Sequence, residues 1–284
     1  MSPRIDPHAH TTASDGTDSP TELLEQAARA GLDVVGITDH DTTAGWEEGV
    51  AAVAKTGVAL LRGVEISCSD DGITVHLLAF LHEAGHSCGL DDLMADSRAQ
   101  RVHRAEAMTD RLARDFPISF ADVTAQAAGA RTIGRPHIAD ALVAAGVVPD
   151  RSAAFAELLH PASPYYVRYL APNPVEVTEL VRQAGGVPVL AHPRARTRQR
   201  RFISEKTIAN MARAGLFALE VQHRDHDDAS RAEVQQIAES LGLYTTGGSD
   251  YHGTGKPNRL GENLTSERVL TALEQEAQMR VIRP

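Results

Sequence analysis

One repeated unit constrains the fold of this 284-residue chain more than any other feature: an amphipathic helix, a glycine, an aliphatic residue and a short apolar strand. In its first occurrence, Ser19-Pro20-Thr21-Glu22 combines an N-cap serine, a proline in the first helical turn and a capping-box glutamate. Gly31 is suited to end that helix in the left-handed conformation, and the apolar segment Leu32–Thr38 follows it. The unit returns at Gly57-Val58, Gly186-Val187, Gly215-Leu216 and Gly242-Leu243.

Helices that alternate with strands predict an α/β fold with a parallel sheet, which is either doubly wound or closed into a barrel. We expect about seven strands, at Ile5–Ala9, Leu32–Thr38, Ala59–Ile66, Ile73–Phe80, Val187–Ala191, Leu219–Val221 and Tyr244–Gly248. The alternation stops between Glu83 and about Tyr165, where segments rich in alanine predict helices at Leu90–Phe116, Ala121–Ala128, Pro136–Ala145 and Ala153–Leu159. We therefore expect a helical insertion, residues 83–165, that packs over the mouth of a barrel formed by residues 1–82 and 166–284.

Composition excludes several other classes of protein. A chain that is 42% apolar and 23% charged is typical of a globular protein and not of a disordered or coiled-coil one. Its longest apolar runs, such as Val34–Ile37, are too short to span a bilayer, and no apolar signal segment follows Met1-Ser2-Pro3-Arg4. Cys68 and Cys88 cannot form a disulfide framework, so we expect a cytoplasmic protein with free thiols. The net charge of −10 argues against a general nucleic-acid binder, unless a local basic patch reverses that balance.

The histidines are the unusual part of the composition, because many of them lie where a predicted strand ends. The carboxyl ends of parallel strands collect the ligand-binding and catalytic groups of such sheets and barrels. Imidazoles and carboxylates from six different strands would therefore meet at one edge, which chance does not readily explain. These residues are His8, His10, Asp15, His40, Glu65, His76, His192, Asp250 and His252.

The spacing of these residues suits metal ions. In an extended His8-Ala9-His10 segment both rings lie on the same face, so both can reach one cation. Nitrogen and carboxylate oxygen ligands without thiolates favour Zn, Mn or Fe. The set is too large for a single ion, and we expect two to three divalent ions.

The motifs as a whole resemble those of the PHP (polymerase and histidinol phosphatase) superfamily of metal-dependent phosphoesterases. The resemblance covers nearly the whole chain and rests on Asp6-Pro7-His8-Ala9-His10-Thr11, Ser14-Asp15-Gly16, Ile37-Thr38-Asp39-His40-Asp41, Gly63-Val64-Glu65-Ile66-Ser67, Ala191-His192-Pro193 and Gly248-Ser249-Asp250-Tyr251-His252. It implies a distorted (β/α)7 barrel, the PHP fold, with a trinuclear metal cluster. Carried over by position, the first ion would be held by His8, His10, Glu65 and Asp250, the second by Glu65, His76 and His192, and the third by Asp15, His40 and His252.

Gly134-Arg135-Pro136-His137, within the helical insertion, resembles the branch of the superfamily that acts on small nucleotides. The resemblance implies hydrolysis of a phosphomonoester, from a nucleoside monophosphate such as AMP or a 3′,5′-nucleoside bisphosphate, by a hydroxide that bridges two metal ions. Three alternatives stay open: a 5′→3′ exonuclease on short RNA or DNA, a phosphatase acting on histidinol phosphate, and a non-catalytic module stabilised by metal.

Selectivity among phosphoesters requires groups outside the cluster. We expect Arg101, Arg104 and Arg135 to bind a substrate phosphate, because a guanidinium matches its oxygens, and we place His137 beside them. His223 could contact the phosphate or protonate the leaving group, and Asp39 would orient a ligand imidazole. The run Arg194, Arg196, Arg198, Arg200 and Arg201 is either a solvated loop or an arm that contacts a second phosphate or a short oligonucleotide.

Overall fold

The computed structural model describes residues 2–85, 88–127, 129–168 and 171–284. Its sheet has seven strands in the order β1-β2-β3-β4-β5-β6-β7, and ten helices are assigned within the described ranges. The strands are β1 (Ile5–Asp6), β2 (Val34–Ile37), β3 (Ala59–Asp70), β4 (Ile73–Phe80), β5 (Val187–Ala191), β6 (Ala218–Gln222) and β7 (Tyr244–Gly247). The helices are α1 (Pro20–Arg29), α2 (Trp46–Thr56), α3 (Leu90–Leu112), α4 (Phe120–Gln126), α5 (Arg135–Ala144), α6 (Arg151–Glu157), α7 (Pro174–Gln183), α8 (Glu205–Arg213), α9 (Asp228–Leu241) and α10 (Glu267–Glu276).

The sheet curls into a nearly closed barrel, as the resemblance to the PHP superfamily implies. The segment after β7 returns beside β1, where the Asp250 amide donates to the carbonyl of His8 at 2.9 Å and the His10 amide donates to the carbonyl of Tyr251 at 2.8 Å. The predicted capping box at the start of α1 is also present, since Ser19 and Glu22 each bind the other's backbone amide. Both the capping box and the barrel are therefore as expected.

The expectation of an all-parallel arrangement is wrong for one strand. β4 pairs antiparallel with both β3 and β5, because β3 and β4 form a hairpin whose two-residue turn, Asp71-Gly72, has both residues in the left-handed region. His76 therefore lies part-way along β4, opposite Ser67 of β3 and Ala191 of β5, and not at the carboxyl end of a strand. His76 nevertheless lies at the level where β5 ends, because it is opposite Ala191, the last residue of that strand.

Side chains alternate between the inside and the outside of the barrel along each strand. One apolar cluster fills the barrel below the polar edge and includes Leu61, Leu78 and Val189 from the strands together with Leu270 from α10. Leu61, Gly63 and Glu65 follow one another on the same face of β3, so the carboxylate of Glu65 lies just above this apolar cluster. A second cluster joins the outer faces of the strands to the surrounding helices.

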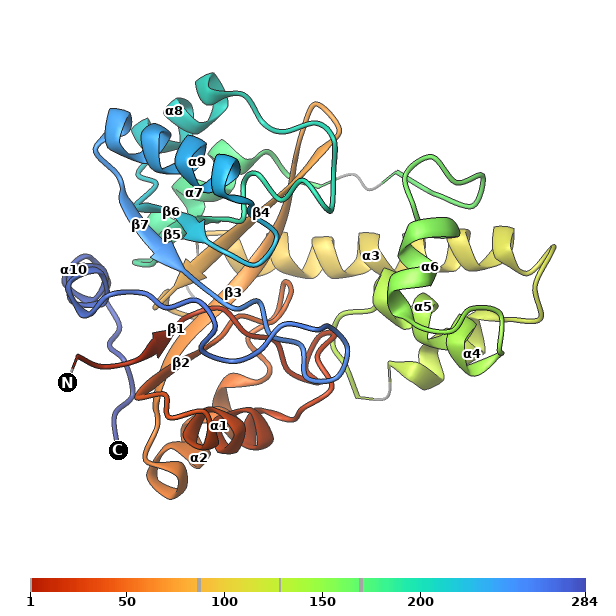
Figure 1. The fold of residues 1–284 in the computed structure, drawn as a ribbon, viewed down its shortest axis with the longest axis horizontal. Coiled ribbons are helices and arrows are strands. Elements are labelled where there is room, and N and C mark those ends of the chain that lie inside the picture. Colours follow the sequence, from red (N-terminus) through yellow and green to blue (C-terminus); the bar gives the residue numbers. More distant parts are fainter. Residues whose placement is uncertain (1, 86–87, 128, 169–170) are drawn as a thin grey trace.

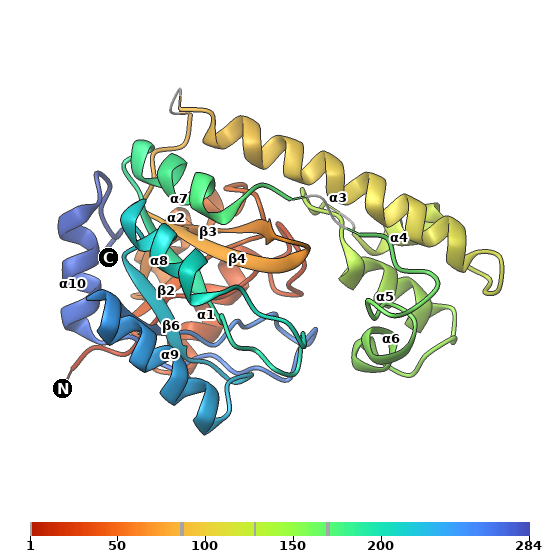
Figure 2. The ribbon, with the colours of Figure 1, turned by 90° about the horizontal axis from the view of Figure 1, so that it is seen from above.

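Helices α3 to α6 form the insertion between β4 and β5. In Figures 1 and 2, α3 runs from the barrel to a group formed by α4, α5 and α6, which lies beside the carboxyl ends of the parallel strands. The insertion has an apolar cluster of its own, with Met108, Leu112 and Ile138 among its buried members. It touches the loops of the polar edge, since the Arg131 amide donates to the carbonyl of Ala13 at 2.9 Å.

The insertion helices begin and end within a few residues of the predicted bounds, although Ala128 lies outside the described residues. In the part of the chain with assigned structure, no helix combines the length and the apolar character that crossing a membrane requires.

Candidate metal centre

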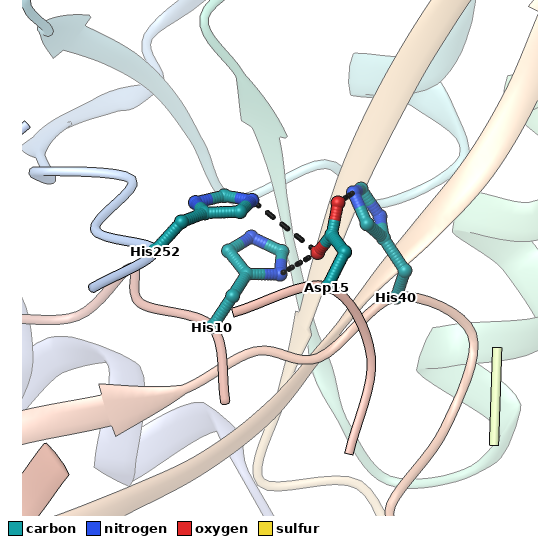
Figure 3. Close-up of side chains that lie close together, drawn as sticks. All are labelled: His10, Asp15, His40 and His252. Atoms are coloured by element: carbon teal, nitrogen blue, oxygen red, sulfur yellow. Dashed lines mark ion pairs between the residues drawn. The ribbon is translucent and has the colours of Figure 1, made fainter. Parts of the chain in front are cut away.

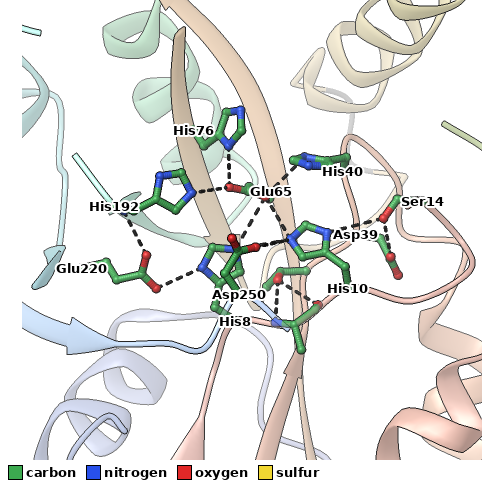
Figure 4. A network of polar contacts seen from close by, with 12 residues as sticks. His8, His10, Ser14, Asp39, His40, Glu65, His76, His192, Glu220 and Asp250 are labelled. Atoms are coloured by element: carbon green, nitrogen blue, oxygen red, sulfur yellow. Dashed lines mark hydrogen bonds and ion pairs between the residues drawn. The ribbon is translucent and has the colours of Figure 1, made fainter. Parts of the chain in front are cut away.

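Glu65 lies at the centre of the polar edge, and both of its oxygens face imidazoles (Figure 4). Oε1 lies 2.7 Å from Nδ1 of His76 and 3.1 Å from Nε2 of His192. Oε2 lies 3.0 Å from Nε2 of His10, 3.3 Å from Nδ1 of His40 and 3.6 Å from Nε2 of His8. Burial opposes the charge of this carboxylate, but the surrounding imidazoles, His76 first among them, hold the pKa of Glu65 well below its usual value.

Asp15 organises a second group on the other side of His10 (Figure 3). Its Oδ1 lies 3.3 Å from Nε2 of His252 and 3.6 Å from Nδ1 of His10, and its Oδ2 lies 3.8 Å from Nε2 of His40. Burial would raise the pKa of Asp15, yet His252 and His40 lower it well below its usual value. Asp15 therefore stays ionised at the centre of three imidazoles.

His8 is held in one orientation by Glu220 of β6. Nδ1 of His8 lies 3.0 Å from Oε1 of Glu220, and the other oxygen of this carboxylate accepts the backbone amide of His192 at 2.9 Å. Burial raises the pKa of Glu220, but the adjacent His8 more than offsets this and the pKa is lowered to about 2. An ionised Glu220 keeps a proton on Nδ1 of His8, so Nε2, which faces Glu65 and Asp250, is the ring nitrogen that can bind a metal ion.

Asp39 acts on the site through another side chain. It accepts the Thr11 amide at 2.8 Å and the Ser14 hydroxyl at 2.6 Å, and Ser14 Oγ lies 3.5 Å from Nδ1 of His10. Burial raises the pKa of Asp39. The expected orienting effect on an imidazole therefore runs through Ser14.

Two proposed ligands have a strained backbone. His192, directly after β5, has φ 29°, and Asp250, shortly after β7, has φ 52°. Residues other than glycine adopt this region at a cost of about 1–3 kcal/mol and keep it where the surroundings over-determine them. Here the Glu220 carboxylate holds the His192 amide, and the carbonyl of His8 holds the Asp250 amide.

Two buried nitrogen atoms without partners, and three close groups of possible ligand atoms, show that these residues are suited to bind metal ions. Among the described residues, Nδ1 of His40 and Nε2 of His252 are buried without a hydrogen-bond partner, although both face carboxylates. Buried polar atoms without partners are rare unless an ion or a water completes them. Three sets of ligand atoms lie within 4.8 Å of one another, which is close to the span of two ligands on one ion. These sets are His8, His10, Glu65 and Asp250; His40, Glu65 and His76; and His10, Asp15, His40 and His252.

The first of these sets is the ligand group that the resemblance implies, the third adds His10 to the expected group, and the second differs. His40 joins Glu65 and His76 there, whereas His192 was expected. His192 is nonetheless 3.1 Å from Oε1 of Glu65, so it also belongs to the cluster. The structure thus brings every expected ligand to one place, and the distribution of ligands among ions stays a prediction.

The three insertion arginines expected to bind substrate line one small pocket, together with Ala105, Met108 and Gly134. Arg101 donates to Oδ2 of Asp41 at 2.8 Å and to the hydroxyl of Ser67. Arg104 and Arg135 both lie against the ring of Tyr166, with the guanidinium carbons 4.9 and 5.9 Å from its centre. The pocket holds about 10 Å³, the space of about one water, so a bound phosphate requires these side chains to move apart.

Two other side chains of the insertion have structural partners. Nδ1 of His137 accepts the Gly134 amide at 3.1 Å and thereby caps α5, which leaves its contact with substrate a prediction. Arg98 of α3 donates to the carbonyl of Asp41 at 2.6 Å. The loop after β2 is therefore held from α3 by both Arg98 and Arg101.

The arginine run after β5 divides into two parts. Arg194 and Arg196 bind Glu233 of α9 at 2.6 and 3.0 Å and hold the loop to that helix. Arg198 turns the other way and donates to Oδ2 of Asp250, with Nη1 3.3 Å from Nε2 of His192. A uniformly solvated loop is therefore the wrong description for this run, because one arginine reaches the cluster.

His223 is fully buried beside the same carboxylate. Its Nδ1 accepts the Asp225 amide at 3.0 Å, and its Nε2 lies 3.7 Å from Oδ2 of Asp250. Sequence reasoning missed four other residues of the site: Asp6, Ser14, Glu220 and Lys256. Asp6 and Glu220 do carry a signal, since a carboxylate inside an otherwise apolar strand needs a buried partner. Lys256 lies in a loop and shows no such signal.

Comparison with known proteins agrees with this geometry. The PHP domain family matches residues 6–129. The 3′,5′-nucleoside bisphosphate phosphatase of Chromobacterium violaceum is 31% identical over 99% of this chain and 98% of its own length. A 5′-3′ exoribonuclease of Haemophilus influenzae is 30% identical over 93% of this chain and 95% of its own.

A solved structure from Bifidobacterium adolescentis, described as a candidate metal-dependent phosphoesterase, superposes with a TM-score of 0.93. It is 45% identical to this chain, and the match covers 98% of each of the two chains. Motifs, barrel and full-length relatives lead to one conclusion: this chain belongs to the PHP family of metal-dependent phosphoesterases and is a hydrolase.

Proposed function

We propose that this protein hydrolyses the phosphomonoester of a small nucleotide, either a nucleoside monophosphate or a 3′,5′-nucleoside bisphosphate. The observation that carries the proposal is the pocket formed by Arg101, Arg104 and Arg135 beside the His-carboxylate cluster. Arg101 joins the two, because it binds Asp41, the neighbour of His40, and Ser67, which is paired with His76. The name of the Chromobacterium relative supports the same substrate class.

In this proposal the cluster residues hold two to three divalent ions of Mn, Fe or Zn. Glu65 is suited to bridge two of them, since its oxygens face different imidazoles. When bound, such ions lower the pKa of water and neutralise charge on phosphate oxygens. Glu220 fixes the tautomer of His8, and Asp39 with Ser14 fixes His10, so the ligand nitrogens are oriented in advance.

We also infer that the insertion, residues 83–165, is a substrate-recognition cap on the barrel formed by residues 1–82 and 166–284. Three of its guanidinium groups, those of Arg101, Arg104 and Arg135, line one pocket, and the ring of Tyr166 lies against two of them. Arg151 of α6 joins cap and barrel, since it binds Asp140 through two hydrogen bonds and the carbonyl of Asp15 at 3.2 Å. A nucleotide bound between cap and cluster would contact both.

The test is phosphate release with Mn²⁺ on four substrates: AMP, adenosine 3′,5′-bisphosphate, histidinol phosphate and a short 5′-phosphorylated RNA. We expect hydrolysis of one or both mononucleotides. Preferred cleavage of the RNA would instead support the exonuclease alternative, which the Haemophilus relative favours. Activity on histidinol phosphate alone, or no activity with a full complement of metal, would refute the proposal.

The variant Arg135→Ala tests the cap. Loss of a hydrogen bond between charged groups is worth roughly 1.5–3 kcal/mol, so kcat/KM should fall by about ten- to a hundredfold. The metal content should stay the same. Arg114→Ala, at an exposed position just beyond α3, is the matched control and should behave as the wild type. A kcat/KM of Arg135→Ala equal to that of the control on every substrate would remove Arg135 from the binding site.

A further inference from the structure

The two oxygens of Asp250 have different surroundings. Oδ1 faces the cluster, at 3.5 Å from Nε2 of His8 and 3.4 Å from Nε2 of His10. Oδ2 faces two cations, because Arg198 donates to it through Nη2 and Lys256 Nζ lies 3.0 Å away. Asp250 therefore connects the proposed metal ligands to a pair of positive side chains.

The two cations come from separate loops that converge on this one oxygen. Arg198 lies between β5 and α8, whereas Lys256 lies between β7 and α10. Figure 2 shows the β5–α8 loop on the side of the barrel that faces the insertion. The side chains are 29% and 31% exposed, so both can be reached from solvent while they touch a buried carboxylate.

A third group points at the same place. Nδ1 of His223 accepts a backbone amide, so the proton of the neutral ring is on Nε2. Among the residues described, this buried Nε2 has no hydrogen-bond partner, and it lies 3.7 Å from Oδ2 of Asp250. A buried donor without an acceptor next to two cations is the arrangement that an anion completes.

The charges around Asp250 indicate which anion would bind there. The positive charge of Arg198 is neutralised by the carboxylates of Asp225 and Asp250. As long as Asp250 keeps its full negative charge, Arg198 does not need another anion. Divalent ions bound at Oδ1 would take up much of that charge, and Arg198 and Lys256 would then face the centre with excess positive charge. A phosphate on the cluster is the anion within reach of both.

We propose that Arg198 and Lys256, with the Nε2 proton of His223, bind the phosphate that is being cleaved. This assignment rests on the proposed function and adds a second set of phosphate contacts to the cap arginines. It also gives the two sets of cations different roles. Arg198 and Lys256 touch a cluster ligand and therefore serve the reacting phosphate, whereas Arg104 and Arg135 lie against Tyr166 and serve the remainder of the nucleotide.

Binding of inorganic phosphate, the product, tests this directly and without turnover. Isothermal titration calorimetry on the Mn²⁺-loaded protein should give a Kd for phosphate that Arg198→Met raises about tenfold or more. Lys256→Met, in a different loop, should act in the same direction. Arg196→Met is the control, because Arg196 lies in the same loop and binds Glu233 and Ser230 of α9, away from the cluster.

Kinetics on two substrates separates the roles. Arg198→Met should lower kcat/KM on AMP and on adenosine 3′,5′-bisphosphate by the same factor, about ten- to a hundredfold, with metal content retained. If Arg198 and Lys256 only balance the charge of Asp250, both variants will bind phosphate as the wild type does and hold metal at least as tightly. That result, or a loss confined to the bisphosphate, would overturn the proposal. If no nucleotide is hydrolysed, the proposed function fails, yet the phosphate titration still decides the assignment of Arg198 and Lys256.

Discussion

Replacing Glu220 by glutamine should weaken metal binding although Glu220 is not itself a proposed ligand. The carboxylate is fully buried and its pKa is about 2, so the substitution removes one negative charge at any pH at which the protein is assayed. Glutamine keeps the shape of the side chain but offers only one acceptor oxygen. It cannot accept both the His8 ring proton and the His192 amide, which Glu220 binds at 3.0 and 2.9 Å.

The size of the effect follows from these two contacts. A hydrogen bond to a charged acceptor contributes roughly 1.5–3 kcal/mol, and partners of metal-bound histidines typically change metal affinity by about ten- to a hundredfold. The two ranges agree, since about 1.4 kcal/mol corresponds to one factor of ten. We therefore expect Glu220→Gln to need about ten- to a hundredfold more free Mn²⁺ for half-maximal phosphate release, and kcat to recover largely at saturating metal.

A chelator-buffered Mn²⁺ titration, followed by phosphate release and elemental analysis, measures this shift. Glu274→Gln is the matched control, because Glu274 of α10 is also a largely buried carboxylate that accepts a backbone amide, and it pairs with Arg283 near the C-terminus and not with a proposed ligand. A half-saturating Mn²⁺ concentration that is the same for Glu220→Gln, the control and the wild type would show that Glu220 does not orient His8. A fall in kcat that saturating metal cannot restore would place Glu220 in the reaction itself.

Two further predictions concern the cluster and the core. Glu65→Gln should leave at least one metal ion fewer per chain by elemental analysis and nearly abolish turnover, because its oxygens face imidazoles on both sides; near-normal turnover at saturating metal would exclude a bridging role. Burial lowers the pKa of His82 from 6.5 to about 4, so the unfolded chain takes up its proton first and stability is lost as the pH falls from 6.5 toward 4. At pH 5 that loss is about 2 kcal/mol relative to pH 7. Other buried histidines lose stability over the same pH range, so urea unfolding at both pH values should show a loss about 2 kcal/mol larger in the wild type than in His82→Phe. An equal pH dependence of the two proteins would contradict this prediction.

The pattern of helices and strands was sufficient to predict an α/β fold and the identities of the clustered residues, and the resemblance to the PHP superfamily added the barrel. Most of the proposed ligands lie in a strand or within a few residues of its end, and parallel strands end at a common edge. The positions of His10, His40 and His192 in the sequence are therefore enough to predict that these side chains lie close together. Helix caps are equally local. The Ser19 capping box involves residues three apart, and it needs no tertiary information to be recognised.

Tertiary structure decided what depends on strand direction and on contacts between distant loops. The antiparallel course of β4 follows from a hairpin turn at Asp71-Gly72, and a pattern of apolar strands does not reveal it. Glu220 meets His8 across 212 positions of sequence, and Arg198 and Lys256 converge on Asp250 from separate loops. Long polar side chains such as these look the same in a sequence whether they end in solvent or on a buried carboxylate, because only the closed barrel determines which charge they meet.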